Sequence, residues 1–124
     1  MKYIMLMIML FAAPVYGSDI AFHAKALDNF IYVADDESNE WSRYDTDSEF
    51  YGDCEDFAFS LQQDIGGKVY YTFLNKSLPH AVLVKDGLVY DMDYNVVTVA
   101  QYQKTNTILF STEMVYGYGY KVTK

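Results

Sequence analysis

The only cysteine of the chain, Cys54, lies within the acidic stretch EFYGDCEDFAFSL at residues 49–61. A cysteine becomes a strong nucleophile when a nearby base removes its proton or when its surroundings stabilise the thiolate. His80, one of two histidines, is a candidate base, and Asp91 or Asp93 could orient its imidazole. These residue types together predict a Cys-His-Asp nucleophilic site, with a buried, inert cysteine as the alternative.

Cys54 is predicted to begin a helix. The apolar positions recur with the spacing of one helical face, at Cys54, Phe57, Ala58, Leu61 and Ile65. Asp53 is a suitable N-cap, and Gly66 with Gly67 forms a suitable stop. The positive end of the helix dipole favours a thiolate, whereas burial and the acids Asp53, Glu55 and Asp56 favour the protonated thiol. The site therefore needs a base.

Segments rich in β-forming residues follow this helix, namely KVYYTFL at 68–74, HAVLVK at 80–85 and LVYDMD at 88–93, with further candidates at 96–100 and 107–122. Residues 86–87, Asp-Gly, predict a two-residue hairpin turn. With this turn, His80 lies opposite Asp93 and one diagonal step from Asp91. Alternation places all three side chains on one face, so an acid can hold one imidazole nitrogen while the other faces the thiol.

Residues 1–17, MKYIMLMIMLFAAPVYG, read as a signal peptide cleaved before Ser18. The apolar core from Tyr3 to Ala13 is shorter than the roughly 20 residues that a stable bilayer anchor needs. A buried first helix or an uncleaved tether is the alternative. We expect one domain at residues 18–124, periplasmic or secreted, monomeric, and without a stable membrane anchor after cleavage.

The composition narrows the classes of partner. The chain has 17 acidic and 9 basic residues and a formal net charge of −8, so it lacks the clustered cations that nucleic-acid phosphates require. Its apolar fraction of 52% is sufficient for a core. A single cysteine cannot pair within the chain, so an exported thiol is buried and inert, bridges two molecules, or is kept for its chemistry.

The region before the cysteine helix is predicted to hold another helix, at residues 18–33, capped by Ser18 or Asp19. Its apolar face comprises Ile20, Ala24, Leu27, Phe30 and Ile31. His23 on this helix is interpreted as a surface or packing residue. A polar loop is expected at 34–50, where Trp41 either plugs the core or lines a substrate groove.

Five features of the sequence resemble the bacterial transglutaminase-like cysteine peptidases, of the transglutaminase-like, papain-related superfamily. They are Trp41, Glu49, GDCEDFA at 52–58, HAVLV at 80–84 and LVYDMD at 88–93, which together span roughly half of the chain after residue 17. The resemblance implies an α+β fold in which the helix bearing the nucleophilic cysteine packs on an antiparallel sheet, as in a papain-like core. We expect about four to six strands in that sheet.

The resemblance also implies roles for residues. Cys54 is the nucleophile, His80 the general base, and Asp91 the orienting acid, with Asp93 as the alternate. The Cys54 amide and the Trp41 indole would hold the oxyanion. Because some members of the family depend on calcium, the acids beside the nucleophile become candidate ligands: Asp53, Glu55 and Asp56. The same acids also suit a helix cap, and the chemistry itself requires no cofactor.

The expected activity is that of an exported peptidase or amidase acting on a protein or peptide substrate. A transamidating crosslinker results if an amine rather than water resolves the thioester. A catalytically inactive binding module for a protein or glycan is a further alternative, since YGYGY at 116–120 offers aromatic surface, although such tyrosines also suit half-buried strands. An effector or inhibitor acting on another protein is the last.

Overall fold

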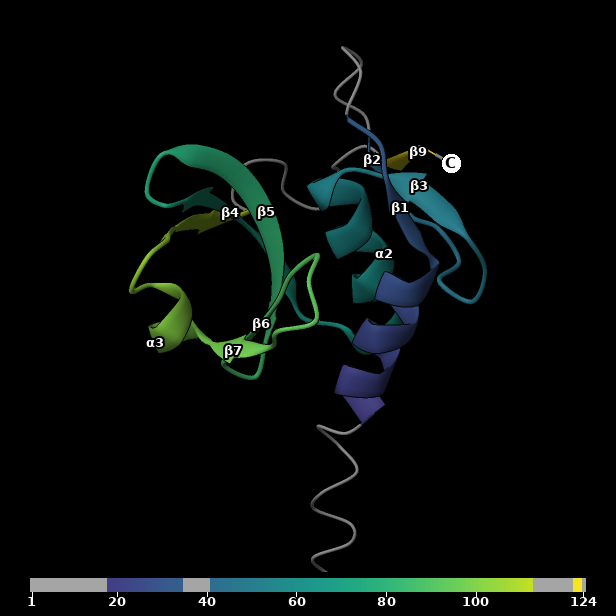
Figure 1. Ribbon diagram of the computed structural model, residues 1–124, viewed down its shortest axis with the longest axis horizontal. Coiled ribbons are helices and arrows are strands. Elements are labelled where there is room, and N and C mark those ends of the chain that lie inside the picture. Colours follow the sequence, from purple (N-terminus) through teal and green to yellow (C-terminus); the bar gives the residue numbers. More distant parts are fainter. Residues whose placement is uncertain (1–17, 35–40, 113–121, 124) are drawn as a thin grey trace, which may run out of the picture.

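The computed structural model describes residues 18–34, 41–112 and 122–123, which form a mixed α+β fold. A curled sheet lies on one side of the molecule, and the N-terminal helix lies on the other (Figure 1). Helix α2 (Cys54–Ile65) lies between them. The predicted signal peptide at 1–17 and the aromatic segment at 116–120 fall outside the described residues.

The main sheet has five antiparallel strands in the order β7-β6-β5-β4-β8, which confirms the predicted class of sheet. Their bounds are β4 Lys68–Leu74, β5 Leu78–Lys85, β6 Leu88–Tyr90, β7 Val97–Thr98 and β8 Thr107–Ser111. The hairpin predicted at 86–87 joins β5 to β6. Both turn residues have positive φ, 51° at Asp86 and 79° at Gly87, as a type I′ turn requires.

The predicted register of this hairpin holds only as far as the strand lasts. Lys85 pairs with Leu88, and Leu83 pairs with Tyr90, where β6 ends. Residues 92–94 then bend, so the predicted pairing of residue 93 with β5 does not form. The predicted strand at 96–100 is also shorter, because a capping box at Thr98 starts the one-turn helix α3 (Val99–Tyr102).

The two faces of the sheet pack against different partners. Along β5, Ala81 and Leu83 are buried in the cluster that includes Phe57 and Leu61 of α2. Val82, between them in sequence, points to the opposite face and packs in the cluster that includes Tyr102 of α3. The alternation of side chains along a strand explains why one strand serves both layers.

Substitution of Leu61 tests the core cluster between α2 and the sheet. It is fully buried in the middle of α2, whereas Leu78 at the start of β5 is 59% exposed. We expect Leu61→Ala to lower the free energy of unfolding by about 2–5 kcal/mol, because it leaves a cavity in a packed interior. The matched change Leu78→Ala should cost less than about 1 kcal/mol. Urea unfolding followed by circular dichroism measures both, and equal losses would contradict the assignment of the core.

The N-terminal region departs from prediction. Residues 18–29 are helical, but Phe30–Tyr32 forms strand β1, parallel to β3 (Phe50–Gly52). The predicted apolar face was right only in part: Leu27 and Phe30 pack against the core, but Ile20 is 45% exposed. The buried residues of the helix are instead Asp19, His23 and Ala26. Lys85 makes burial of the Asp19 carboxylate tolerable by pairing with it at 2.8 Å.

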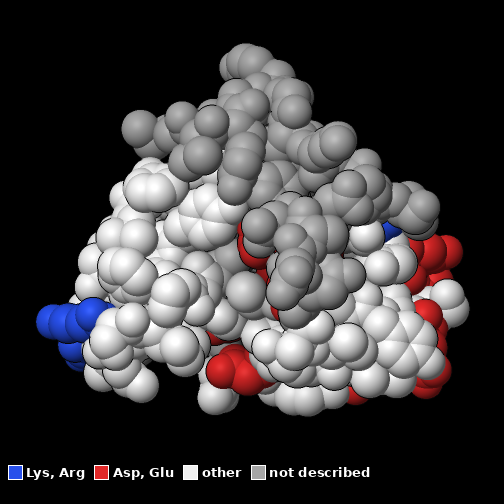
Figure 2. All heavy atoms as spheres, turned by 90° about the horizontal axis from the view of Figure 1, so that it is seen from above, with Lys and Arg blue, Asp and Glu red and all other residues white. Residues whose placement is uncertain are grey.

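Short parallel pairing also occurs between β2 (Trp41–Ser42) and β9 (Val122–Thr123). β2 and the beginning of β3 therefore replace parts of the polar loop predicted at 34–50. On the face shown in Figure 2, acidic side chains gather along one edge and reach the centre, whereas basic ones lie mainly at the opposite edge. No helix in the described part of the chain combines the length and the apolarity needed to span a bilayer.

Candidate functional site

The start of α2 is held by a capping box formed by two aspartates. Asp53 Oδ1 accepts hydrogen bonds from the backbone of Glu55 at 3.1 Å and of Asp56 at 3.3 Å. Asp56 Oδ2 accepts one from the Asp53 backbone at 3.1 Å in return. The Cys54 amide is not used by this cap, so the cysteine stands in the first turn with its N–H outside the capping contacts.

Gly52 explains part of the GDCEDFA motif. A Cβ built on this residue would lie 2.4 Å from the Cβ of Asp56, closer than real side chains approach. The Asp56 carboxylate fills that space, because it bonds the Ser42 amide at 2.8 Å as well as the Asp53 amide. The glycine therefore lets β3 run close to the first turn of α2 and places Cys54 where that turn meets β5.

Cys54 and His80 line the same cavity, of about 110 Å³, at the contact between α2 and β5. The other lining residues are Glu55, Tyr71, Pro79 and Ala81. Cys54 and His80 both belong to the described part of the chain, and the thiol and the imidazole form no hydrogen bond with each other. They share a cavity, and any proton transfer between them must occur within it.

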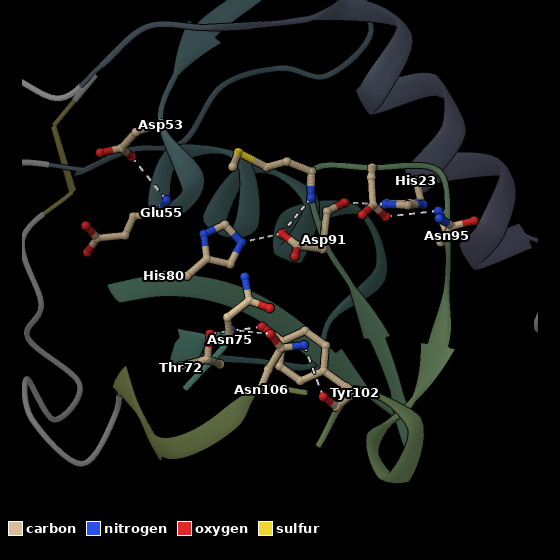
Figure 3. Close-up of polar contacts among 12 residues, drawn as sticks. His23, Asp53, Glu55, Thr72, Asn75, His80, Asp91, Asn95, Tyr102 and Asn106 are labelled. Carbon is tan, nitrogen blue, oxygen red and sulfur yellow. Dashed lines mark hydrogen bonds and ion pairs between the residues drawn. The ribbon is translucent and has the colours of Figure 1, made fainter. Parts of the chain in front are cut away.

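His80 is oriented by a carboxylate (Figure 3). Its Nε2 lies 2.6 Å from Asp91 Oδ1, and Asp91 Oδ1 also accepts from the Met92 backbone at 2.7 Å. Because an ionised carboxylate only accepts hydrogen bonds, Nε2 carries the proton and Nδ1 of the neutral ring is left as the base. In Figure 3 this second nitrogen faces the side on which α2 begins.

Asp93, the alternate acid, lies elsewhere. Its carboxylate is exposed and accepts from the Asn95 backbone at 3.0 Å. The hairpin register favoured Asp93 for the position opposite His80, but β6 ends at Tyr90 and the chain then turns, which directs Asp91 to the imidazole. The structure thus brings Asp91, not Asp93, together with His80.

The thiol of Cys54 is protonated at neutral pH. Burial raises its pKa to about 12, and the carboxylates of Asp53 and Glu55 add to the rise. The backbone N–H of Ala81, which donates toward the sulfur, opposes the rise only in part. The positive end of the helix dipole therefore does not outweigh burial and the neighbouring acids, and the thiol needs a base to become a nucleophile.

The candidate calcium ligands do not converge. Asp53 and Asp56 accept backbone hydrogen bonds at the cap, and Glu55 Oε2 accepts from the Tyr71 hydroxyl at 3.1 Å. Within the described ranges, no group of three histidine, cysteine or acidic side chains is arranged to hold a metal ion. Calcium stays a prediction of the sequence resemblance.

Trp41 contributes its backbone to β2, but its indole, predicted to help hold the oxyanion, is outside the described side chains.

His23, which was interpreted as a surface or packing residue, is buried, with 1% of its surface exposed. Its Nε2 lies 2.7 Å from the carbonyl oxygen of Asp91. No local signal could reveal this contact, because 68 residues separate the two.

The sequence was compared with protein families and with curated proteins. No protein-family model and no curated protein matches the sequence. The residues around Cys54 and their chemistry are therefore the basis for assigning a function.

Proposed function

We propose that this chain is an exported cysteine peptidase or amidase with a transglutaminase-like, papain-like core. Cys54 is the nucleophile, His80 the general base and Asp91 the acid that orients it. The observation that supports this best is the 2.6 Å hydrogen bond from His80 to Asp91 beside the cavity that His80 shares with Cys54. The hydrogen bond leaves Nδ1 of His80 available as a base beside the cavity that Cys54 also lines.

The first half of the reaction forms a thioester. His80 Nδ1 takes the proton from Cys54 Sγ as the sulfur attacks the carbonyl carbon of the scissile amide. The Cys54 N–H, free of the capping contacts, donates to the oxyanion that develops, and the Trp41 indole is a second expected donor. When the C–N bond breaks, the imidazolium returns its proton to the leaving amine.

The second half releases the acyl group. His80 removes a proton from water as the oxygen attacks the thioester carbon. When the C–S bond breaks, the imidazolium returns that proton to the sulfur, which gives a carboxylic acid and the free thiol. An amine in place of water gives a new amide, which is the crosslinking alternative. Because the pKa of the Cys54 thiol is raised, little thiolate is present at neutral pH. His80 therefore removes the thiol proton during the attack on the carbonyl, not before it.

The test is a digest of a protein-derived peptide library by the purified protein in H₂¹⁸O. Hydrolysis through Cys54 predicts new carboxyl termini that carry one ¹⁸O, detected by mass spectrometry. Added methylamine distinguishes the two outcomes, because a transamidase forms methylamides at the same positions. No new termini and no methylamides across a broad library would contradict both enzyme assignments and leave the binding module.

The two aspartates offer a matched comparison for the orienting role. We expect Asp91→Asn to lower kcat/KM by about 10²- to 10⁴-fold. The neutral amide can favour the wrong tautomer of His80, and it cannot stabilise the imidazolium that forms during the reaction. Asp93→Asn removes an exposed carboxylate that does not touch His80 and should change kcat/KM less than about twofold. Steady-state kinetics on a peptide from the library measures both. A larger loss for Asp93→Asn would move the orienting role to that residue.

A further inference from the structure

His23 is a buried polar residue on the N-terminal helix. Its ring packs edge-on against Phe57 of α2 and Tyr90 of β6, with centroid separations of 6.0 and 5.4 Å. A buried imidazole costs free energy unless its polar atoms are bonded. Here Nε2 lies 2.7 Å from the Asp91 carbonyl oxygen, and because a carbonyl only accepts, the ring must donate its Nε2–H.

Asp91 stands where the sheet no longer holds the chain. The last pair of the β5–β6 ladder is Leu83 with Tyr90, and the residues from 92 to 94 bend away. The carbonyl of Asp91 therefore lies beyond the ladder, and the bond from His23 supplies the restraint that a neighbouring strand would otherwise give. The side chain is held separately, since Oδ1 accepts from the Met92 backbone and from His80.

We propose that His23 is a positioning residue, which fixes the end of β6 through the Asp91 carbonyl so that the Asp91 carboxylate meets the ring of His80. One aspartate is thus held between two imidazoles, one on its backbone and one on its side chain (Figure 3). The catalytic consequence rests on the proposed function, whereas the restraint on His80 does not.

The choice of histidine fits this role. Phenylalanine would fill the same space between Phe57 and Tyr90 but has no donor for the carbonyl. Burial lowers the pKa of His23, against the opposing effect of the backbone bond and of the Asp91 and Asp93 carboxylates. The ring therefore stays neutral at pH 7, and it restrains Asp91 without adding a positive charge that would compete with His80 for the carboxylate.

The first experiment is NMR of the full chain labelled with ¹⁵N-histidine. The proposal requires that His23 carries its proton on Nε2 and that the His80 Nε2–H, bonded to a carboxylate, gives a downfield resonance, assigned by its absence in His80→Gln. In wild type, Nε2 of His23 found unprotonated would overturn the proposal without any variant of His23.

Variants then test the restraint itself. His23→Phe keeps the ring and removes the donor, and we expect exchange of the His80 Nε2–H with water to accelerate at least about tenfold. His23→Gln, which keeps an N–H donor, should restore part of the protection. Asn29→Leu is the control, because it removes a bond of 2.8 Å from the same helix to the Thr46 carbonyl and does not touch Asp91. Unchanged exchange in folded His23→Phe would overturn the proposal.

Kinetics separate this inference from the proposed function. In an active protein, His23→Phe should lower kcat by about 10- to 100-fold with KM within about twofold. It loosens the acid that orients the base, but His23 does not line the cavity beside Cys54. Should the wild type cleave nothing, the proposed function fails, and the NMR result still decides the role of His23. A variant that does not fold leaves the wild-type tautomer measurement as the deciding result.

Discussion

Replacing Cys54 by serine is expected to lower kcat/KM for amide cleavage by about 10⁴-fold or more. The substitution exchanges one sulfur for oxygen and leaves the capping box of Asp53 and Asp56 in place. A serine hydroxyl is far less acidic than a thiol and a weaker nucleophile, so the His80 base cannot compensate. The rate of appearance of ¹⁸O-labelled termini, with the same peptide and the two proteins, measures the loss.

Stability provides the control for this change. Cys54 is only partly buried at the margin of the core and lines a cavity, so Cys54→Ser should alter the free energy of unfolding by less than about 1 kcal/mol. A folded Cys54→Ser protein that retained more than about one hundredth of the wild-type rate would exclude thioester chemistry. It would direct attention to water activated by His80 instead.

Replacing His80 by glutamine is expected to change how the Cys54 thiol responds to pH. With a pKa of about 12, the thiolate fraction at pH 7 is about 10⁻⁵, and it rises about tenfold per pH unit. In His80→Gln, the rate of Cys54 alkylation by iodoacetamide should rise with the same dependence, about tenfold per pH unit. In wild type His80 can take the proton, so alkylation at pH 7 should be at least about 100-fold faster and depend less on pH.

The pH range of this experiment follows from the same shift. The pKa of the folded thiol is raised above its ordinary value of 9.0, so the unfolded chain ionises first as the pH rises. The resulting contribution to stability is complete below pH 9.0 and is lost between there and about 12. Intact-mass measurements from pH 6 to pH 9 therefore report on the folded protein. Equal rates and equal tenfold slopes in both proteins would identify Cys54 as an inert buried thiol.

Local signals located the parts of the site that depend on neighbours in sequence. The apolar spacing from Cys54 to Ile65, with Asp53 before it and Gly66 after it, predicted α2 with its observed bounds. The turn at 86–87 predicted the hairpin and its register as far as Tyr90, because two residues with positive φ determine how the adjoining strand residues pair. Cys54 thus lies at the start of α2, and His80 lies on β5, one strand of this hairpin.

The same signals failed where distant segments compete. The N-terminal helix ends at residue 29 because Phe30–Tyr32 pairs with β3, and helical spacing alone cannot reveal that partner. Its buried face holds Asp19 and His23, two polar residues that an apolar pattern excludes. Each is tolerated inside only because a residue more than 60 positions away, Lys85 or Asp91, bonds it.

The candidate nucleophile, its helix and the strand that carries the base could be predicted from local sequence, since capping, periodicity and turn chemistry act over a few residues. That Asp91 rather than Asp93 meets His80, that His23 bonds the Asp91 carbonyl, and that the Cys54 thiol stays protonated became evident from the folded chain. Those outcomes depend on where β6 ends and on how much water the packed elements exclude. Desolvation and contacts between distant segments exist only once the chain has folded.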